Sequence, residues 1–127
     1  MSITSIKDNL NITDKVIDFL KSKQFFREQK GKVFFVSGKE ARPSTTKLIL
    51  VNTLFAMADN DTGVIDGYLN VNIQDTDNIW IEYLSELISL FLDQSKIDGF
   101  KLEFSNEHLF KVSEDVYFKN LKFKFSK

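Results

Sequence analysis

Residues 69–92 restrict the fold of this chain more than any other segment. Residues 69–73 read Leu-Asn-Val-Asn-Ile, an alternation with the two-residue period of a strand that buries one face. A half-buried strand that leads into a helix with one apolar face predicts a helix packed on a sheet. The apolar positions of that helix recur at helical spacing: Ile79, Trp80, Tyr83, Leu84, Leu87, Ile88, Phe91 and Leu92.

The helix over residues 79–92 has clear boundary signals. Residues 75–78, Asp-Thr-Asp-Asn, precede it and supply N-cap candidates, whose side-chain oxygens accept hydrogen bonds from the free amides of a first helical turn. Glu82 and Glu86 mark its solvent side, and the Asp-Gly pair at 98–99 ends the segment.

A second helix is predicted near the N-terminus. Asn11 or Thr13 serves as its N-cap, and Asp14 then lies in the first turn, where a negative charge interacts favourably with the helix dipole. Residues 1–10 are either a flexible arm or, over residues 3–9, a short preceding turn. The helix is supported by apolar positions at helical spacing and by basic positions toward its C-terminal end: Val16, Ile17, Phe19, Leu20, Lys21, Lys23 and Arg27.

Two strands are expected between these helices in addition to the alternating one. Residues 32–36 and 47–57 are rich in apolar and β-branched side chains. Residues 37–46 between them are polar, contain the only proline and predict a loop. The Asp-Asn-Asp-Thr-Gly run at 59–63 predicts a turn, which leads into the alternating strand over residues 64–73.

Two more strands close the chain. Residues 100–104 alternate Phe, Leu and Phe with Lys and Glu, and residues 121–125 alternate Leu, Phe and Phe with lysines. Residues 108–112 are available to pair as a further short strand between them.

The element order predicts an α+β fold. It shows no βαβ repetition, so we expect a mostly antiparallel sheet of four to six strands, with the N-terminal helix and one long amphipathic helix packed on one face. A length of 127 residues is expected to form a single domain over residues 1–127.

The aromatic content points to contacts between copies. Thirteen residues are phenylalanine, against one tryptophan and three tyrosines. Each buried ring removes ~150–250 Å² from water, and thirteen rings are more than a small core hides easily. We therefore expect a hydrophobic subunit interface.

The charge balance does not favour a nucleic-acid-binding protein. The chain has 17 Lys and Arg against 18 Asp and Glu, a formal net charge of −1, without the basic excess of a free nucleic-acid binder. The C-terminal end is locally basic, with Lys119, Lys122, Lys124 and Lys127. We interpret these lysines as protection of an edge strand against aggregation.

The absence of cysteine excludes disulfides, thiolate metal sites and a cysteine nucleophile. The first residues lack the basic and apolar stretches of a secretory signal. The longest apolar segment, residues 79–92, contains two glutamates and is too short to cross a bilayer. We expect a soluble protein that contacts no membrane and is used in a cytoplasm or in a particle assembled there.

No catalytic, cofactor-binding or metal-binding site is predicted. The single histidine, His108, lies on a predicted strand without a second His or any Cys to share a metal or a proton. A Gly-x-Ser-x-Gly motif, which would expose a serine nucleophile, is absent. Ser37-Gly38-Lys39 lacks the first glycine of a phosphate-binding loop, and Glu40 stands where Ser or Thr is required.

Two acidic runs have simpler explanations than metal binding. In the run at 59–63, Gly63 occupies a place where a calcium loop needs an oxygen ligand, so a plain turn is expected. Asp75 and Asp77 are better explained as capping residues than as ligands of a hard metal ion. Trp80, in the first helical turn, is a candidate for a half-exposed position at a subunit contact.

The order and length of these elements resemble the tail terminator and tail-completion proteins of long-tailed bacteriophages. The resemblance covers residues 12–126. Its most characteristic part is the strand Gly-Tyr-Leu-Asn-Val-Asn-Ile at 67–73, which runs through Asp75 and Asp77 into the helix at 79–92. Residues 100–125 resemble the closing hairpin of those proteins.

This resemblance implies a non-enzymatic structural protein of the virion tail or neck, assembled in the host cytoplasm. It implies a ring of identical copies, commonly a hexamer, that sits on the tail tube and joins it to the head. Tail-tube and head-completion or connector proteins would be its partners, and DNA would pass through the channel as cargo. The loop at 37–46 and the turn at 59–63 would then contact the channel or the next ring.

Two other classes of function stay open at this stage. One is a small non-catalytic protein-binding module, such as an adaptor or an inhibitor-type protein. The other is an enzyme that uses Asp, Lys or Tyr alone, for which the sign would be a deep pocket that holds a buried, charge-paired carboxylate.

Overall fold

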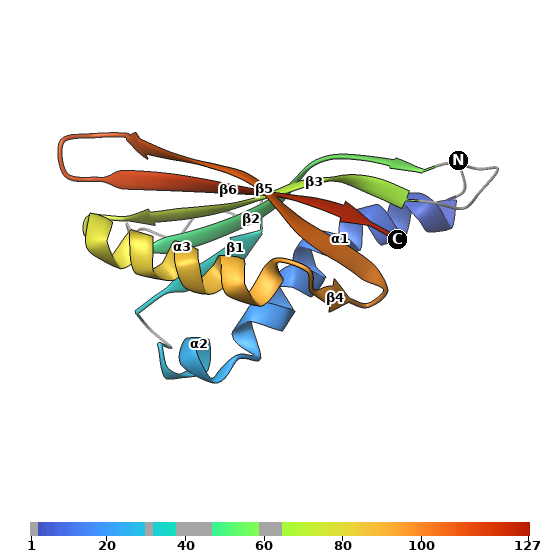
Figure 1. Cartoon of the computed structure of the whole chain (residues 1–127), viewed down its shortest axis with the longest axis horizontal. Helices are drawn as coiled ribbons and strands as arrows, with labels where there is room; N and C mark the ends of the chain where they lie inside the picture. The colour runs from blue at the N-terminus through green and yellow to red at the C-terminus, as the bar shows by residue number, and fades with distance from the viewer. Residues whose placement is uncertain (1–2, 30–31, 38–46, 59–64) are drawn as a thin grey trace.

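The computed structural model describes residues 3–29, 32–37, 47–58 and 65–127. Helices and strands follow one another in the order shown in Figure 1. The elements are α1 (Ile3–Lys21), α2 (Gln24–Glu28), β1 (Phe34–Ser37), β2 (Leu48–Ala58), β3 (Ile65–Asp75), α3 (Asn78–Leu92), β4 (Lys96–Ile97), β5 (Phe100–Lys111) and β6 (Tyr117–Ser126).

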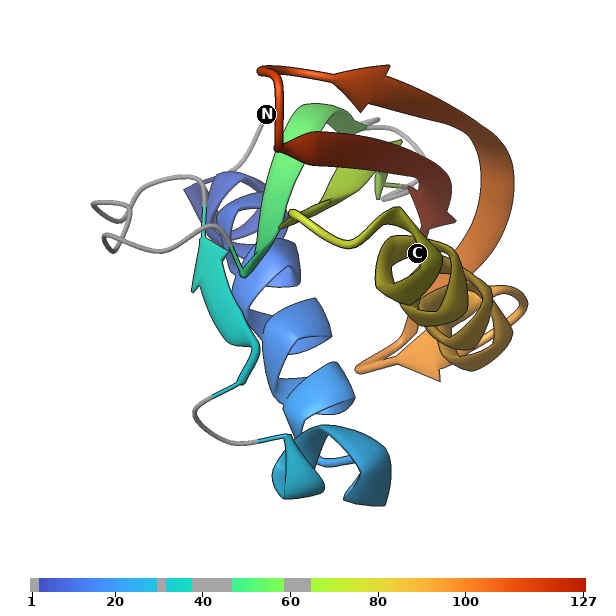
Figure 2. The same cartoon turned by 90° about the vertical axis from the view of Figure 1, so that its left-hand side faces the viewer.

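The strands form one six-stranded sheet in the order β1-β2-β3-β6-β5-β4. β1 and β2 are parallel, and every other neighbouring pair is antiparallel. The sheet curls around α1 and α3, which lie on the same side of it (Figure 2). The predicted α+β class, with a mostly antiparallel sheet and two helices on one face, is therefore confirmed.

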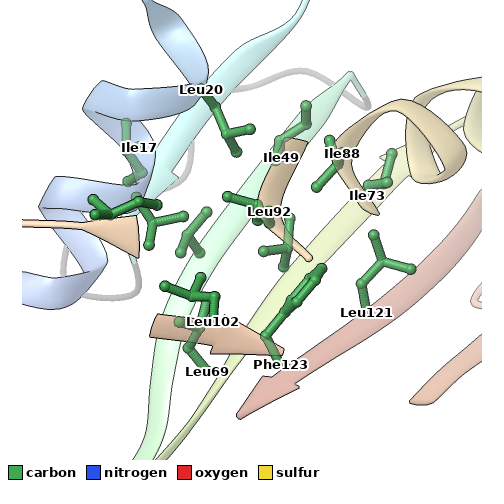
Figure 3. Close-up of a cluster of buried hydrophobic side chains, with 14 of the residues drawn as sticks. Ile17, Leu20, Ile49, Leu69, Ile73, Ile88, Leu92, Leu102, Leu121 and Phe123 are labelled. Carbon is green, nitrogen blue, oxygen red and sulfur yellow. The ribbon is translucent and has the colours of Figure 1, made fainter. Parts of the chain in front are cut away.

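The core lies between the helices and this inner face of the sheet (Figure 3). Because side chains alternate along a strand, each strand contributes every second residue to it. From the helices, the fully buried side chains include Ile12, Val16, Leu20, Ile81, Ile88 and Leu92. From the strands, they include Ile49, Val51, Leu69, Val71, Ile73, Phe100, Leu102, Leu121, Phe123 and Phe125.

The predicted start of the first helix is wrong. α1 begins at Ile3, so neither Asn11 nor Thr13 is its N-cap. Thr13 lies inside the helix, where its hydroxyl is 2.9 Å from the hydroxyl of Thr53 on β2. A residue type that caps helices can therefore also serve inside one when its hydroxyl finds a partner on the neighbouring strand.

The predicted end of that helix differs as well. The chain leaves helical geometry at Lys23, which has an extended backbone with φ −73° and ψ 138°. The hydroxyl of Ser22 donates a 2.6 Å hydrogen bond to the carbonyl of Phe19 at this break. Arg27 therefore belongs to the separate short helix α2, which turns Phe26 into the core.

The segment at 98–99 is a two-residue hairpin turn that joins β4 to β5. Asp98 and Gly99 both have positive φ, 50° and 86°, which is the geometry of the turn that matches strand twist and favours Asp-Gly. The side chain of Lys15 on α1 forms an ion pair with Asp98 and ties this turn to the helix.

β5 is one long strand, so residues 108–112 are not the separate short strand expected from the sequence. A bulge explains the misleading pattern. Phe104 is opposite Phe123, but Asn106 is opposite Lys122, so Ser105 is an extra residue in β5. Beyond it the alternation shifts by one residue, and Glu107 lies on the inner face.

β6 is an interior strand, because it pairs with β3 on one side and β5 on the other. The interpretation of its lysines as protection of a sheet edge is therefore wrong. Lys119 lies on the inner face and is buried, whereas Lys122 and Lys124 lie on the outer face. In the part of the chain that the structure describes, no helix has the length and hydropathy needed to cross a membrane.

Candidate interaction surface

The distal half of the β5–β6 hairpin is exposed over most of its length and extends at the left of Figure 1. Every residue of the run 103–115 is exposed. Leu109, Phe110 and Val112 expose 49%, 50% and 56% of their surface, although each is a large apolar side chain. The ring of Phe110 lies 6.2 Å from that of Phe118 on the other arm. Such a concentration of exposed apolar surface is typical of a contact site for another protein.

One edge of β5 is open along this hairpin. β4 pairs only with Phe100 and Lys101. Beyond that, the amide of Leu102 donates to the carbonyl of Ser95 at 3.0 Å, and the amide of Phe104 donates to Asp93 at 2.8 Å. Among the described residues, no strand pairs with residues 106–111 along the backbone edge that faces away from β6. An unpaired edge of this kind accepts a strand from another chain.

An open groove of about 520 Å³ runs between α3 and β5. Glu82, Glu86, Asp93 and Glu107 line it, and Lys119 is its basic residue. The ammonium group of Lys119 bonds both carboxylate oxygens of Glu82, at 2.9 and 3.0 Å, and lies 3.4 Å from Glu107. The groove is therefore acidic, and its buried lysine is already satisfied by two carboxylates.

α3 adds an apolar stripe on the side turned away from the core. Ile79, Tyr83 and Leu90 follow one another at helical spacing and expose 79%, 50% and 75% of their surface. Leu90 also lines the groove beside Phe104. The helix therefore has two apolar faces. One packs on the sheet, and the other faces outward.

Trp80 is half-buried at the first turn of α3, beside α2. Its ring stacks on that of Tyr83, with centroids 5.7 Å apart and planes inclined by 15°. The ring of Phe25 lies 6.0 Å from Trp80 and 5.7 Å from Tyr83. The aromatic rings thus join α2 to α3, and Tyr83 carries this cluster to the surface.

The outer face of the sheet carries a row of asparagine side chains. Asn120 on β6 donates to the side-chain oxygens of Asn70 and Asn72 on β3, at 3.0 and 2.6 Å. Asn72 in turn donates to Asn52 on β2 at 3.3 Å. These bonds link three strands on the face that neither helix covers.

The carboxylates before α3 behave as capping residues. Asp75 is buried, and its Oδ1 accepts hydrogen bonds from the amides of Thr76 and Asp77, at 2.6 and 3.2 Å. Asp77 accepts from the amides of Ile79 and Trp80, at 2.9 and 3.2 Å, and so caps the helix as predicted. In the described segments, no group of three or more Asp, Glu, His or Cys residues is arranged to hold a metal ion.

The remaining candidates from the sequence lie apart from one another. His108 is exposed on the outer face, opposite Asn120 and 6.2 Å from the ring of Phe110. Ser37 ends β1, while the rest of the loop at 37–46 and the turn at 59–63 lie outside the described residues. Sequence reasoning missed the contacts of Lys119, because Glu82 and Glu107 have only the pattern of solvent-exposed residues.

Comparisons with known proteins identify the fold. No protein-family model matches the chain, and no curated protein matches it. A chain in a solved structure described as the virion of a native gene transfer agent (GTA) particle superposes with a TM-score of 0.62. The sequences are 14% identical, and the match covers 91% of this chain and 92% of that chain. The chain therefore shares its overall fold with a component of that particle structure.

Proposed function

We propose that this chain is a structural protein of a phage-like virion, of the tail-terminator type, which forms a ring at the junction of head and tail. The observation that carries the proposal is the fold shared with a chain of a gene transfer agent virion over almost the full length of both chains. The resemblance to tail terminators in element order independently leads to the same kind of particle.

The surface of the molecule supports an assembly role. Exposed apolar side chains occupy the β5–β6 hairpin and the outer side of α3, and both are suited to contact other chains. A closed ring needs two different surfaces on each copy, because its contacts are head-to-tail. The proposed partners are further copies, commonly six in a ring, together with tail-tube and head-completion or connector proteins. DNA passes through as cargo.

The groove between α3 and β5 supports a non-enzymatic role. Its buried charge is Lys119, which forms ion pairs with Glu82 and Glu107. The sign expected for an enzyme was a buried, charge-paired carboxylate, but here the two carboxylates are each about half exposed. A protein-binding adaptor or inhibitor would use the same exposed surfaces, so assembly is the property that distinguishes the two functions.

The test is incubation of the purified chain with tail tubes made from the tube protein encoded near its gene. Native mass spectrometry and negative-stain electron microscopy should show rings of one stoichiometry that cap tube ends and stop tube growth. A chain that leaves tube length unchanged and instead binds one cellular partner in a one-to-one complex would support the adaptor or inhibitor function. Portal, connector and tube genes beside this gene are the expected genomic setting.

A further inference from the structure

The open segment of β5 has a self-complementary sequence. Residues 106–111 read Asn-Glu-His-Leu-Phe-Lys, with Leu109 between an acidic residue two positions before it and a basic residue two positions after it. An antiparallel pair of identical strands centred on Leu109 therefore places each Glu107 opposite the Lys111 of the other copy. Opposite charges that face each other across two strands stabilise the pair.

The faces of β5 agree with this pairing. Beyond the bulge, Glu107, Leu109 and Lys111 lie opposite inner-face residues of β6 and share the helix-covered side. His108 and Phe110 lie opposite Asn120 and Phe118 and share the outer side. The pairing centred on Leu109 thus joins residues of the same face, with a charge pair on one side and a histidine against an aromatic ring on the other.

Neighbouring registers lack the charge pair. If His108 faced its own copy, Glu107 would face Leu109, and if Phe110 faced its own copy, Lys111 would face Leu109. Only the register centred on Leu109 joins opposite charges within this segment. We infer that a second copy of this chain docks on the free edge of β5, by antiparallel β5–β5 pairing about a twofold axis at Leu109.

The surroundings leave room for the second copy. All the residues from Glu103 to Asp115 are exposed. Glu107 meets Lys119 through Oε2 at 3.4 Å, and a carboxylate has further acceptor sites for Lys111 of the other copy. The pairing also covers an edge that would otherwise promote unspecific aggregation.

This contact goes beyond the proposed ring. A twofold contact uses the same patch on both copies, whereas a ring contact joins two different patches. The paired copies are thus a dimer of free subunits, or a bridge between two rings, and the inference holds whether or not the chain is a virion protein.

Single-cysteine variants test the twofold axis directly, because the natural chain has no cysteine. In the inferred register, the two copies of Leu109→Cys have Cα atoms ~4.5–5.5 Å apart, within the range that a disulfide spans. Val112→Cys is the matched control, since Val112 lies on the same hairpin and is 56% exposed, against 49% for Leu109. In the inferred register, the Cα atoms of the two residues 112 are six residues apart along the paired strands, a distance of about 20 Å.

Mild oxidation should therefore convert Leu109→Cys to a covalent dimer much faster than Val112→Cys. The expected dimer also keeps the circular dichroism spectrum of the natural chain, because position 109 is a surface position. Equal cross-linking rates for the two variants, or a natural chain that stays monomeric in sedimentation equilibrium, would overturn the inference.

Charge reversal gives a second, independent readout by sedimentation equilibrium. Lys111→Glu puts like charges opposite each other twice in the dimer, so we expect the dissociation constant to rise about ten-fold. Added salt should weaken the natural dimer but strengthen the Lys111→Glu dimer, because salt screens attraction in one and repulsion in the other. Lys96→Glu, an exposed charge reversal on β4, is the control and should not change the constant. If Lys111→Glu and Lys96→Glu have the same effect, β5 is not the contact.

Discussion

The ammonium group of Lys119 bonds both carboxylate oxygens of Glu82, at 2.9 and 3.0 Å, and so joins an interior strand to the helix that covers it. The lysine side chain is 6% exposed, whereas Glu82 is 51% exposed. A buried lysine needs such partners, because an unpaired charge in this position would lose its hydration without compensation. The carboxylates of α3 and β5 thus make it possible for a lysine to occupy the inner face of the sheet.

Removal of Glu82 should destabilise the fold. Glu82→Ala leaves Lys119 with Glu107 alone, and we expect the free energy of unfolding to fall by about 1–2 kcal/mol, a value reduced by the exposure of the carboxylate. Urea denaturation measures this change. Glu86→Ala, on the solvent side of the same helix, is the control and should have little effect. Lys119→Met removes the charge and keeps the volume, so it should cost less than Glu82→Ala. Equal losses for Glu82→Ala and Glu86→Ala would show that the contact contributes nothing.

The asparagine row on the outer face should be energetically coupled. Asn120→Ala removes the donor to Asn72, which is 8% exposed, so we expect a loss of about 1–2 kcal/mol for an unsatisfied acceptor. The double variant Asn72→Val/Asn120→Val replaces both partners with strand-forming residues and should lose less than the sum of the single Val variants. Chemical denaturation of the four proteins of this cycle gives the coupling. Strict additivity would contradict the role of this hydrogen bond.

The N-cap of α3 should contribute measurably to stability. Asp77→Ala leaves the amides of Ile79 and Trp80 without their acceptor, and we expect a loss of about 1 kcal/mol. Asp77→Ser retains a capping oxygen and should recover most of this loss. Thermal unfolding followed by circular dichroism compares the three proteins. The capping role would be refuted if the serine variant were as unstable as the alanine variant.

The ion pair between Lys15 and Asp98 should make stability depend on pH in the acid range. The hydrogen bond from Lys15, and then its positive charge, lower the pKa of Asp98 below the ordinary value of 3.8. A depressed carboxyl pKa stabilises the folded state above the ordinary value, and this contribution disappears as the pH falls through the folded value. Asp98→Asn should therefore have a lower melting temperature than the natural chain at about pH 7, and the gap should narrow at about pH 3.

Asparagine is the matched substitution at this position because it tolerates the positive φ of 50° that Asp98 adopts. Because the side chain of Asp98 is 65% exposed, we expect a small effect. A melting-temperature gap that stayed constant from neutral to acid pH would assign the loss to the turn itself rather than to the ion pair.

Local patterns in the sequence predicted the elements whose signals lie within one segment. The alternation over residues 69–73 predicted β3, and the apolar stripe with its capping run predicted α3 and the role of Asp77. These signals are local because burial of one face sets the period of each element. The predicted start of α1 was wrong, because Thr13 has the residue type of an N-cap. The actual partner of its hydroxyl is on β2, 40 residues away.

The candidate surface depended on pairings that no local pattern contains. Lys119 shares the alternation of Leu121, Phe123 and Phe125, so its inward orientation follows from the local pattern. Its partners on α3 and β5 are what no local pattern contains. The bulge at Ser105 likewise has no compositional signal, yet it decides which side Glu107 faces. The open edge of β5 follows from the shortness of β4, a two-residue strand that sequence reasoning did not predict.

The bulge at Ser105 determines which face of the sheet each later residue of β5 occupies. Because Ser105 is the residue without a partner in β6, its loss would leave Asn106 opposite Lys122 and every later residue of β5 on its present side. If the natural sequence paired without the bulge, Ser105 would instead lie opposite Lys122, Glu107 would turn away from Lys119, and His108 would lie on the inner face. The bulge, and not the composition of the arm alone, therefore decides which side chains the arm presents to a neighbour.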